Sequence, residues 1–251
     1  MKQLFFFSAA VALATSISFA QPPSLPGAGN CLSFNGTSDY VEIPTYANLN
    51  FAAPATISFW FKSSVDVENN VFGLGKTTPG TGGGFGIVVG GNPTGTLTNE
   101  LITILRDSNN RYGYVSSTRT EVIDNRWHHI AVVCNGTQTF IYLDGISKPI
   151  TVGSAADCSN DGKYGGQTNI TSASIGQVTW NGIKTEFTNG QIDEVRIWNR
   201  ALTQTEIRDN LCQKLIGNET GLVGYWRFDE TSGTTAYDSQ TNVAPNNGTL
   251  K

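Results

Sequence analysis

The sequence predicts an all-β protein in which two antiparallel sheets pack as a sandwich, and three observations lead to this fold class. The chain has 28 glycines in 251 residues but only 14% charged residues, and such a composition disfavours long solvated helices. Short strand-like runs recur over residues 31–199 with turn signals between them. No helical pattern alternates regularly with these runs, which excludes a βαβ fold.

The expected strands follow one another at short intervals. They are residues 31–36, 40–44, 56–63, 70–76, 85–90, 100–107, 127–136, 139–145, 172–177 and 190–199. Asn-Gly and Asp-Gly steps predict turns with positive φ between antiparallel strands. These steps lie at 35–36, 135–136, 144–145, 161–162 and 181–182. About ten short strands of this kind are typical of a sandwich or jelly roll.

One short helix is expected after the last of these strands. Thr203 is a suitable N-cap, and Glu206 completes a capping box three residues later. Ile207, Leu211 and Leu215 then fall on one face at helical spacing. The helix is interpreted as a packing element.

Residues 1–20 are interpreted as a signal peptide. Lys2 precedes an apolar run over 4–13, and Ser18 and Ala20 provide small residues at a cleavage point. The run is too short for a comfortable membrane span, and 21–30 ("QPPSLPGAGN") has the composition of a linker. We therefore expect a secreted protein, extracellular or at the cell surface, without membrane insertion.

The four cysteines predict two disulfides in an oxidising compartment. Three pairings are possible among Cys31, Cys134, Cys158 and Cys212. Joining Cys31 to Cys212 would connect the two ends of the domain, and Cys134 to Cys158 would then close a short loop. A zinc site is disfavoured because the chain has no CxxC spacing and only two histidines.

The two histidines are adjacent in "DNRWHHIAVV" and are interpreted as parts of a core strand. Strand alternation places His129 with Ala131 on one face and His128 with Ile130 on the other. The pair therefore cannot hold one metal ion, and no nucleophile signature accompanies it. We expect buried imidazoles with a structural role.

Four segments resemble the laminin-G-like, concanavalin A-like jelly-roll domain, in the branch found in secreted bacterial proteins. They are "LSFNGTSDYVEIP", "TISFWFKS", "RWHHIAVVCNGTQTFIYLDG" and "NGQIDEVRIWNRALTQTEI". The resemblance implies two sheets packed face to face over a domain at 31–217. It also implies adhesion to carbohydrate or cell-surface protein, sometimes as a module attached to a glycoside hydrolase.

The C-terminal extension, residues 218–251, leaves two alternatives open. Family members commonly carry "GLVGYWRFDETSG" before the first strand, whereas here it follows the helix. The segment is either a closing strand of the same domain or the start of a truncated second repeat, and the departure from the family order slightly favours the repeat.

The sequence predicts a binding module and not an enzyme. The resemblance implies an E-x-D-x-E pattern for a glucanase of this fold, and the chain lacks it. A glycoside hydrolase or its accessory module stays an alternative, as does a purely structural repeat of a surface protein. The net charge of 16 − 20 = −4 gives no electrostatic footprint for nucleic acid.

A structural Ca²⁺ is a further expectation. Asp193 shares strand phase with Val195 and Ile197, so its carboxylate is expected to face apolar neighbours and to need a cation, an arginine or backbone N–H groups. The resemblance suggests calcium near the last strand, with Asp39 and Asn35 as further oxygen donors. The alternative is a turn-capping Asp39 and a hydrogen-bonded Asp193.

Aromatic residues in loops are the candidate glycan ligands. Tyr112, Tyr114, Tyr164 and Trp180 lie among glycines and asparagines. Flat rings beside amides and acids suit sugar binding by stacking and planar hydrogen bonds. The alternative is that these rings cover the ends of the sandwich.

Overall fold

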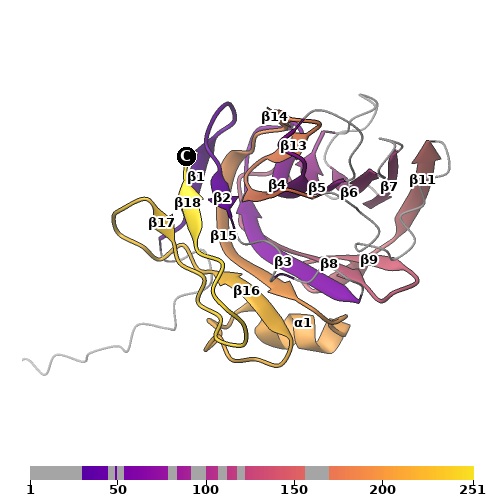
Figure 1. Ribbon diagram of the computed structural model, residues 1–251. Helices are drawn as coiled ribbons and strands as arrows, with labels where there is room; N and C mark the ends of the chain where they lie inside the picture. Colours follow the sequence, from indigo (N-terminus) through magenta and orange to yellow (C-terminus); the bar gives the residue numbers. More distant parts are fainter. Residues whose placement is uncertain are drawn as a thin grey trace, which may run out of the picture.

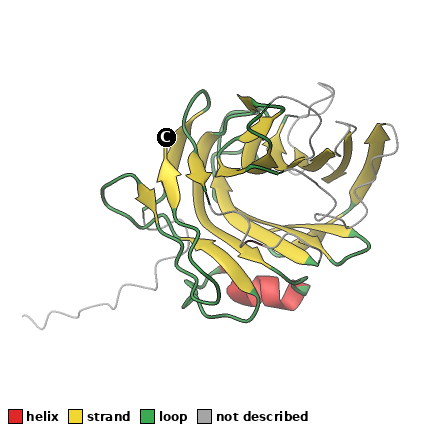
Figure 2. Ribbon diagram, in the orientation of Figure 1, coloured by secondary structure: helices red, strands yellow, loops and turns green. Residues whose placement is uncertain are grey.

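The computed structural model describes residues 30–44, 49, 54–78, 84–91, 100–106, 112–117, 122–155 and 170–251. Two antiparallel sheets face each other, and one helix lies outside one of them (Figures 1 and 2). The predicted sandwich is therefore confirmed. The described elements are β1 (Leu32–Asn35), β2 (Val41–Ile43), β3 (Ala55–Lys62), β4 (Asn69–Gly75), β5 (Gly84–Gly90), β6 (Glu100–Arg106), β7 (Tyr112–Ser117), β8 (His128–Cys134), β9 (Thr139–Leu143), β10 (Ile146–Lys148), β11 (Ile150–Ala155), β12 (Ser172–Ile175), β13 (Val178–Trp180), β14 (Ile183–Thr185), β15 (Asn189–Trp198), α1 (Gln204–Leu211), β16 (Leu222–Trp226), β17 (Thr235–Ala236) and β18 (Gly248–Leu250).

The strands form two large sheets and one small hairpin. Sheet A has the order β1-β15-β3-β8-β9-β10, with β16 also paired to β15. Sheet B has the order β11-β7-β6-β5-β4-β12-β2-β18-β17. The β13–β14 hairpin pairs only with itself among the described strands. The main core between the sheets includes the buried rings of Phe59, Phe61, Phe72, Phe85 and Trp226.

Strand β8 occupies the centre of sheet A, between β3 and β9, as its apolar character predicts. Ile130 and Val132 belong to the core between the sheets. Ala131 and Val133 belong to a second cluster on the outer face. Both faces are apolar because α1 and neighbouring segments cover the outer side of sheet A (Figure 1).

The predicted helix is confirmed, together with its capping box. The Thr203 side chain accepts a hydrogen bond from the Glu206 backbone N–H, and the Glu206 side chain accepts one from the Thr203 backbone. The helix ends at Leu211, so the expected helical position of Leu215 is corrected. Leu215 is still buried in the outer cluster, but from the segment that follows the helix.

The C-terminal extension adds strands to both sheets of the domain. Strand β16 pairs with β15, and β18 pairs with β2. Trp226 lies in the main core, and its indole N–H donates to the Asn246 carbonyl at 3.1 Å. Of the two alternatives that the sequence left open, the structure therefore contains the closing strands.

The β13–β14 hairpin lies directly on strands of sheet B because glycines leave room for it. A Cβ atom on Gly73 would lie 2.6 Å from the Gln177 carbonyl oxygen, and one on Gly84 would meet the Trp180 ring. A Cβ on Gly75 would overlap the Thr179 carbonyl. The backbone of β13 can approach this closely only above residues without side chains.

We expect Gly75→Ala to lower the free energy of unfolding by about 1 to 3 kcal/mol, because the added methyl group forces the hairpin away from the sheet. Gly91→Ala is the matched control, since its Cβ would meet no atom closer than 3.3 Å. Urea unfolding of both variants measures the difference. Equal losses would contradict the close packing of the hairpin.

Candidate ligand-binding groove

A broad groove of about 620 Å³ opens where several strands end. Its walls come from the β1–β2 turn, the β3–β4 loop, the end of β5 and the β14–β15 connection. We call it the rim groove. Its lining residues are Gly36, Val67, Glu68, Gly91, Lys184, Thr185, Glu186, Phe187 and Asn189.

Glu186 is held in a fixed position at this groove. Its Oε1 accepts a hydrogen bond from the Trp180 indole N–H at 2.8 Å, and its Oε2 accepts one from the Asn70 side-chain amide at 3.0 Å. The Asn70 backbone N–H also donates to the Glu186 carbonyl at 3.1 Å. The backbone of Glu186 has a φ of 55°, a conformation that costs energy for a residue with a side chain and needs such support.

Two aromatic rings and a lysine lie beside the same connection. The Phe187 ring, which is half-buried, lies 6.4 Å from the Tyr40 ring at an interplanar angle of 59°. Lys184 donates to the Tyr40 hydroxyl, and its Nζ lies 4.3 Å from the centre of that ring. Tyr40 also borders a neighbouring cleft of about 150 Å³. The groove thus combines an aromatic side with a polar side.

Two carboxylates share the groove. Burial raises the pKa of Glu68 above its ordinary value, and the negative charge of Glu186 raises it further. Within the described part of the chain, no lysine or arginine lies within ion-pair distance of either carboxylate. In the described ranges, the two carboxylates therefore have no cationic partner within ion-pair distance.

The structure describes the backbone position of three of the four aromatic residues predicted as glycan ligands, and all three lie in strands. Tyr112 and Tyr114 belong to strand β7, which pairs with β6 and β11, so their expected loop position is corrected. Tyr164 lies outside the described residues. Trp180 belongs to β13, and its side chain is only 9% exposed. It contributes to the groove indirectly, by orienting Glu186.

Sequence reasoning missed the residues that do line or border the rim groove. Glu68 and Phe187 are far apart in the chain, and only the tertiary fold places them on the same groove. One local sequence pattern could have pointed to the residues of this groove. The segment "KTEFTNG" puts an acid and an aromatic ring between turn residues just before the last strand of the motif.

The residues predicted to bind calcium are not brought together. Asp39 accepts hydrogen bonds from the Asn35 backbone and side-chain amides at 3.1 and 2.7 Å, so these two residues stabilise a turn. Asn35 pairs with Asn189, whereas Asp193 lies just beyond the other end of the β1–β15 ladder. Strand geometry separates those positions by about 13 Å. This ligand set therefore does not fit one Ca²⁺ ion.

Asp193 also has a different environment from the one predicted. Between Asp193 and Arg196 the pairing of β15 with β3 shifts, and Glu194 has a φ of 53°. This β-bulge breaks the alternation, so Val195 enters the main core while Asp193, opposite Trp60, does not. The Asp193 carboxylate accepts a hydrogen bond from the Glu194 backbone N–H at 2.9 Å.

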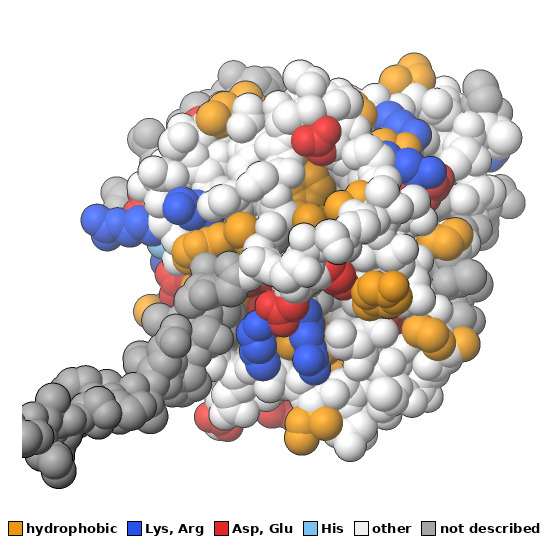
Figure 3. All heavy atoms as spheres, turned by 90° about the vertical axis from the view of Figure 1, so that its left-hand side faces the viewer, with side chains coloured by type: hydrophobic (Ala, Val, Ile, Leu, Met, Phe, Trp, Pro, Cys, Tyr) orange, Lys and Arg blue, Asp and Glu red, His pale blue; other side chains and the backbone are white. Residues whose placement is uncertain are grey.

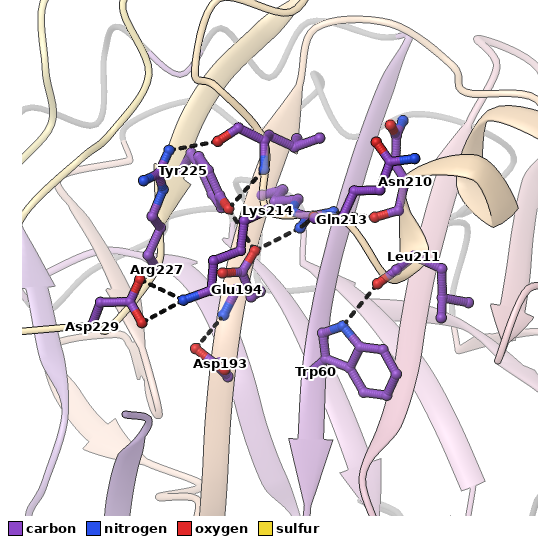
Figure 4. Close-up of polar contacts among 12 residues, drawn as sticks. Trp60, Asp193, Glu194, Asn210, Leu211, Gln213, Lys214, Tyr225, Arg227 and Asp229 are labelled. Atoms are coloured by element: carbon purple, nitrogen blue, oxygen red, sulfur yellow. Dashed lines mark hydrogen bonds and ion pairs between the residues drawn. The ribbon is translucent and has the colours of Figure 1, made fainter. Parts of the chain in front are cut away.

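The bulge places Glu194 in a buried polar network on the outer face of sheet A (Figure 4). Its Oε2 accepts from Arg196 and from the Tyr225 hydroxyl, each at 2.6 Å. Arg196 also donates to the Asn210 and Gln213 carbonyls at 2.7 and 2.5 Å. The "IDEVRIW" motif thus fixes the end of α1 to the sheet, which is a structural role.

The predicted Cys31–Cys212 disulfide is not present in the structure. Cys31 and Cys212 are both thiols, the first half-buried before β1 and the second exposed at the C-cap of α1. Burial, and then the nearby Asp193 carboxylate, raise the pKa of the Cys31 thiol. The other pairing involves Cys158, which lies outside the described residues.

The two histidines face opposite sides of sheet A, as predicted, but only His129 is fully buried. His128 is half-buried, and its ring nitrogens lie 2.9 Å from Asp144 and 3.1 Å from Asp124. The hydrogen bond to Asp144 is the main reason why the pKa of His128 is raised. His129 packs edge-on against Trp60, with ring centres 5.5 Å apart.

Figure 3 shows acidic and basic side chains close to one another on the face it presents, with hydrophobic side chains scattered between them. In the described ranges, His, Cys, Asp and Glu side chains form no group of three that could hold a metal ion. No described helix has the length and apolar character needed to cross a bilayer.

The fold and the groove define a two-sheet β-sandwich with a candidate ligand site among its strand ends. Residues 35–208, more than half of the chain, match the Laminin_G_3 family model, described as the concanavalin A-like lectin/glucanases superfamily. The chain therefore belongs to this family. A search of curated protein sequences gives no match.

Solved structures share the fold at low sequence identity. A structure from Bacteroides ovatus ATCC 8483, proposed to be a carbohydrate binding protein, has a TM-score of 0.56 and 17% identity over 89% of this chain and 58% of that chain. The CBM40 module of the Ruminococcus gnavus IT-sialidase has a TM-score of 0.55 and 13% identity over 73% of this chain and 98% of the module. That module has also been solved with alpha2,3 sialyllactose. The NanB sialidase of Streptococcus pneumoniae has a TM-score of 0.52 and 18% identity over 76% of this chain and 29% of the enzyme.

Proposed function

We propose that the chain is a non-catalytic carbohydrate-binding module of a secreted protein and that it binds glycan in the rim groove. The observation that carries this proposal is the pairing of an aromatic side with a fixed carboxylate in one open groove. Phe187 supplies the ring, and Glu186 supplies acceptor atoms whose position Trp180 and Asn70 determine.

This arrangement suits sugars for chemical reasons. A pyranose has an apolar face of C–H groups that stacks on an aromatic ring, and hydroxyl groups at its edge that donate to carboxylate oxygens. Convergent polar groups beside an apolar wall are the general pattern of a small-molecule site. The solved relatives that are carbohydrate-binding modules support the proposal at the level of the fold.

We expect Phe187→Ala to weaken glycan binding about tenfold, because the stacking ring is lost. Tyr237→Ala is the matched control, since Tyr237 is 58% exposed and lies outside the groove. A glycan panel identifies a ligand, with and without Ca²⁺, and calorimetry on that ligand compares the variants. The proposal fails if the panel gives no ligand in either condition, or if both variants bind like the unmodified protein.

Glycoside hydrolysis in the same groove is a second candidate, favoured by one observation. Glu68 has a raised pKa beside Glu186, and glycosidases use two neighbouring carboxyl groups in different protonation states. The openness of the groove favours binding over catalysis, because catalysis benefits from exclusion of water. The same glycan panel decides between binding and hydrolysis. If the protein releases reducing ends from a glycan and Glu68→Gln abolishes this release, the chain is an enzyme and the binding-module proposal is wrong.

A further inference from the structure

The charges of the rim groove restrict which glycans it accepts. Its titratable lining groups are Glu68, Glu186 and Lys184. Lys184 is directed to Tyr40, whose hydroxyl it contacts. Glu186 is fixed by two neutral donors, the Trp180 indole and the Asn70 amide, neither of which cancels its charge. Among the described residues, the polar wall of the groove therefore carries two carboxylates that form no ion pair with a lysine or arginine.

Like charges in one groove raise the cost of binding an anion and lower the cost of binding a cation. An acidic sugar would bring a third carboxylate to Glu68 and Glu186, which is unfavourable. A protonated amine would lie between the two carboxylates and form charge-assisted hydrogen bonds with them. The exposed Val67 and the Phe187 ring would meanwhile contact the apolar face of the sugar.

On the basis of the proposed function, we infer that the rim groove selects glycans that carry protonated amino groups over acidic glycans. The selecting residues are Glu68 and Glu186, with Trp180 and Asn70 as positioning residues for Glu186. The CBM40 module was solved with a sialylated, acidic ligand. The present chain would therefore share the fold of that module but have the opposite charge preference.

Three oligosaccharides test this inference on the full chain by calorimetry. They are fully deacetylated chitotetraose at a pH where its amines are protonated, N-acetylated chitotetraose, which has the same backbone without charge, and 3′-sialyllactose. We expect the deacetylated tetramer to bind most tightly and its affinity to fall with added salt. Glu68→Gln should weaken binding of the deacetylated tetramer about three- to fivefold, which is the usual effect of removing one partly exposed charge pair.

Asp209→Asn is the matched control, since it removes the same charge from the exposed surface of α1. If Glu68→Gln and Asp209→Asn lose the same affinity for the deacetylated tetramer, the effect is one of overall charge and the inference is overturned. Equal binding of the two chitotetraoses, or tighter binding of sialyllactose, would also overturn it while leaving glycan binding intact. If neither these three sugars nor the wider glycan panel gives a ligand, the proposed function falls as well.

Discussion

Arg196→Met is expected to lower the free energy of unfolding by about 3 to 5 kcal/mol, among the largest losses from any single change in this chain. Arg196 is 1% exposed, and its guanidinium contacts the equally buried Glu194 carboxylate at 2.6 Å. Methionine preserves much of the apolar volume but leaves Glu194 as a buried charge without its cation. Breaking one partner of such a pair typically costs this much.

Arg196→Met would also remove hydrogen bonds other than those of the ion pair with Glu194. The guanidinium also donates to the Asn210 carbonyl in the last turn of α1 and to the Gln213 carbonyl just beyond the helix. Tyr225 would still donate to Glu194, and burial raises the pKa of its hydroxyl, so it remains protonated as a donor. One neutral donor does not replace the lost cation.

A double variant separates the buried charge from the lost packing. Arg196→Met combined with Glu194→Gln removes both charges, so we expect it to be more stable than Arg196→Met alone. Arg126→Met is the surface control, because the Arg126 side chain is 82% exposed. Urea unfolding measures all three. A loss in Arg196→Met no larger than in Arg126→Met would show that the network contributes little.

The fold could be predicted from the sequence where the determining interactions are local. The capping box of α1 depends on Thr203 and Glu206, three residues apart, and alternation assigned both faces of β8 correctly. Asp193 was misplaced because the bulge at Glu194 interrupts the alternation on which its assignment rested. At that bulge Glu194 accepts a hydrogen bond from Tyr225, which is distant in the chain.

The candidate site was harder to predict because long-range packing determines it. Trp180 has the loop-like sequence context of an exposed platform, yet glycines on β4 and β5 allow its hairpin to lie flat and bury the ring. Glu186 has no recognisable motif. Its position depends on Asn70, a contact between residues more than one hundred positions apart that periodicity does not reveal.

His129 is expected to make the protein sensitive to acid. Burial, and then the charge of Arg196, lower the pKa of His129 from 6.5 to about 3. The folded state therefore keeps the imidazole neutral, while the unfolded chain takes up a proton below pH 6.5. Stability from this group is present above pH 6.5 and is lost as the pH falls toward 3, by about 1.4 kcal/mol per pH unit and about 5 kcal/mol in total.

His129→Phe tests this expectation, because phenylalanine keeps a ring against Trp60 but does not titrate. Between pH 6 and pH 4, the free energy of unfolding should fall less steeply in the variant than in the unmodified protein. The carboxylates Asp124 and Asp144, whose pKa values are lowered, contribute acid sensitivity to both proteins, so the acid-side slope of the variant is reduced and does not vanish. Parallel curves would contradict a neutral buried His129.

His128 provides the control of opposite sign in the same strand. Its hydrogen bonds to Asp144 and Asp124 raise its pKa, so the stability it contributes is fully present below pH 6.5 and is lost as the pH rises through the raised value. His128→Gln should therefore flatten the stability curve above pH 6.5, whereas His129→Phe flattens it below pH 6.5. Two adjacent residues with opposite pH responses follow from strand alternation, which buries one ring under α1 and directs the other toward two carboxylates.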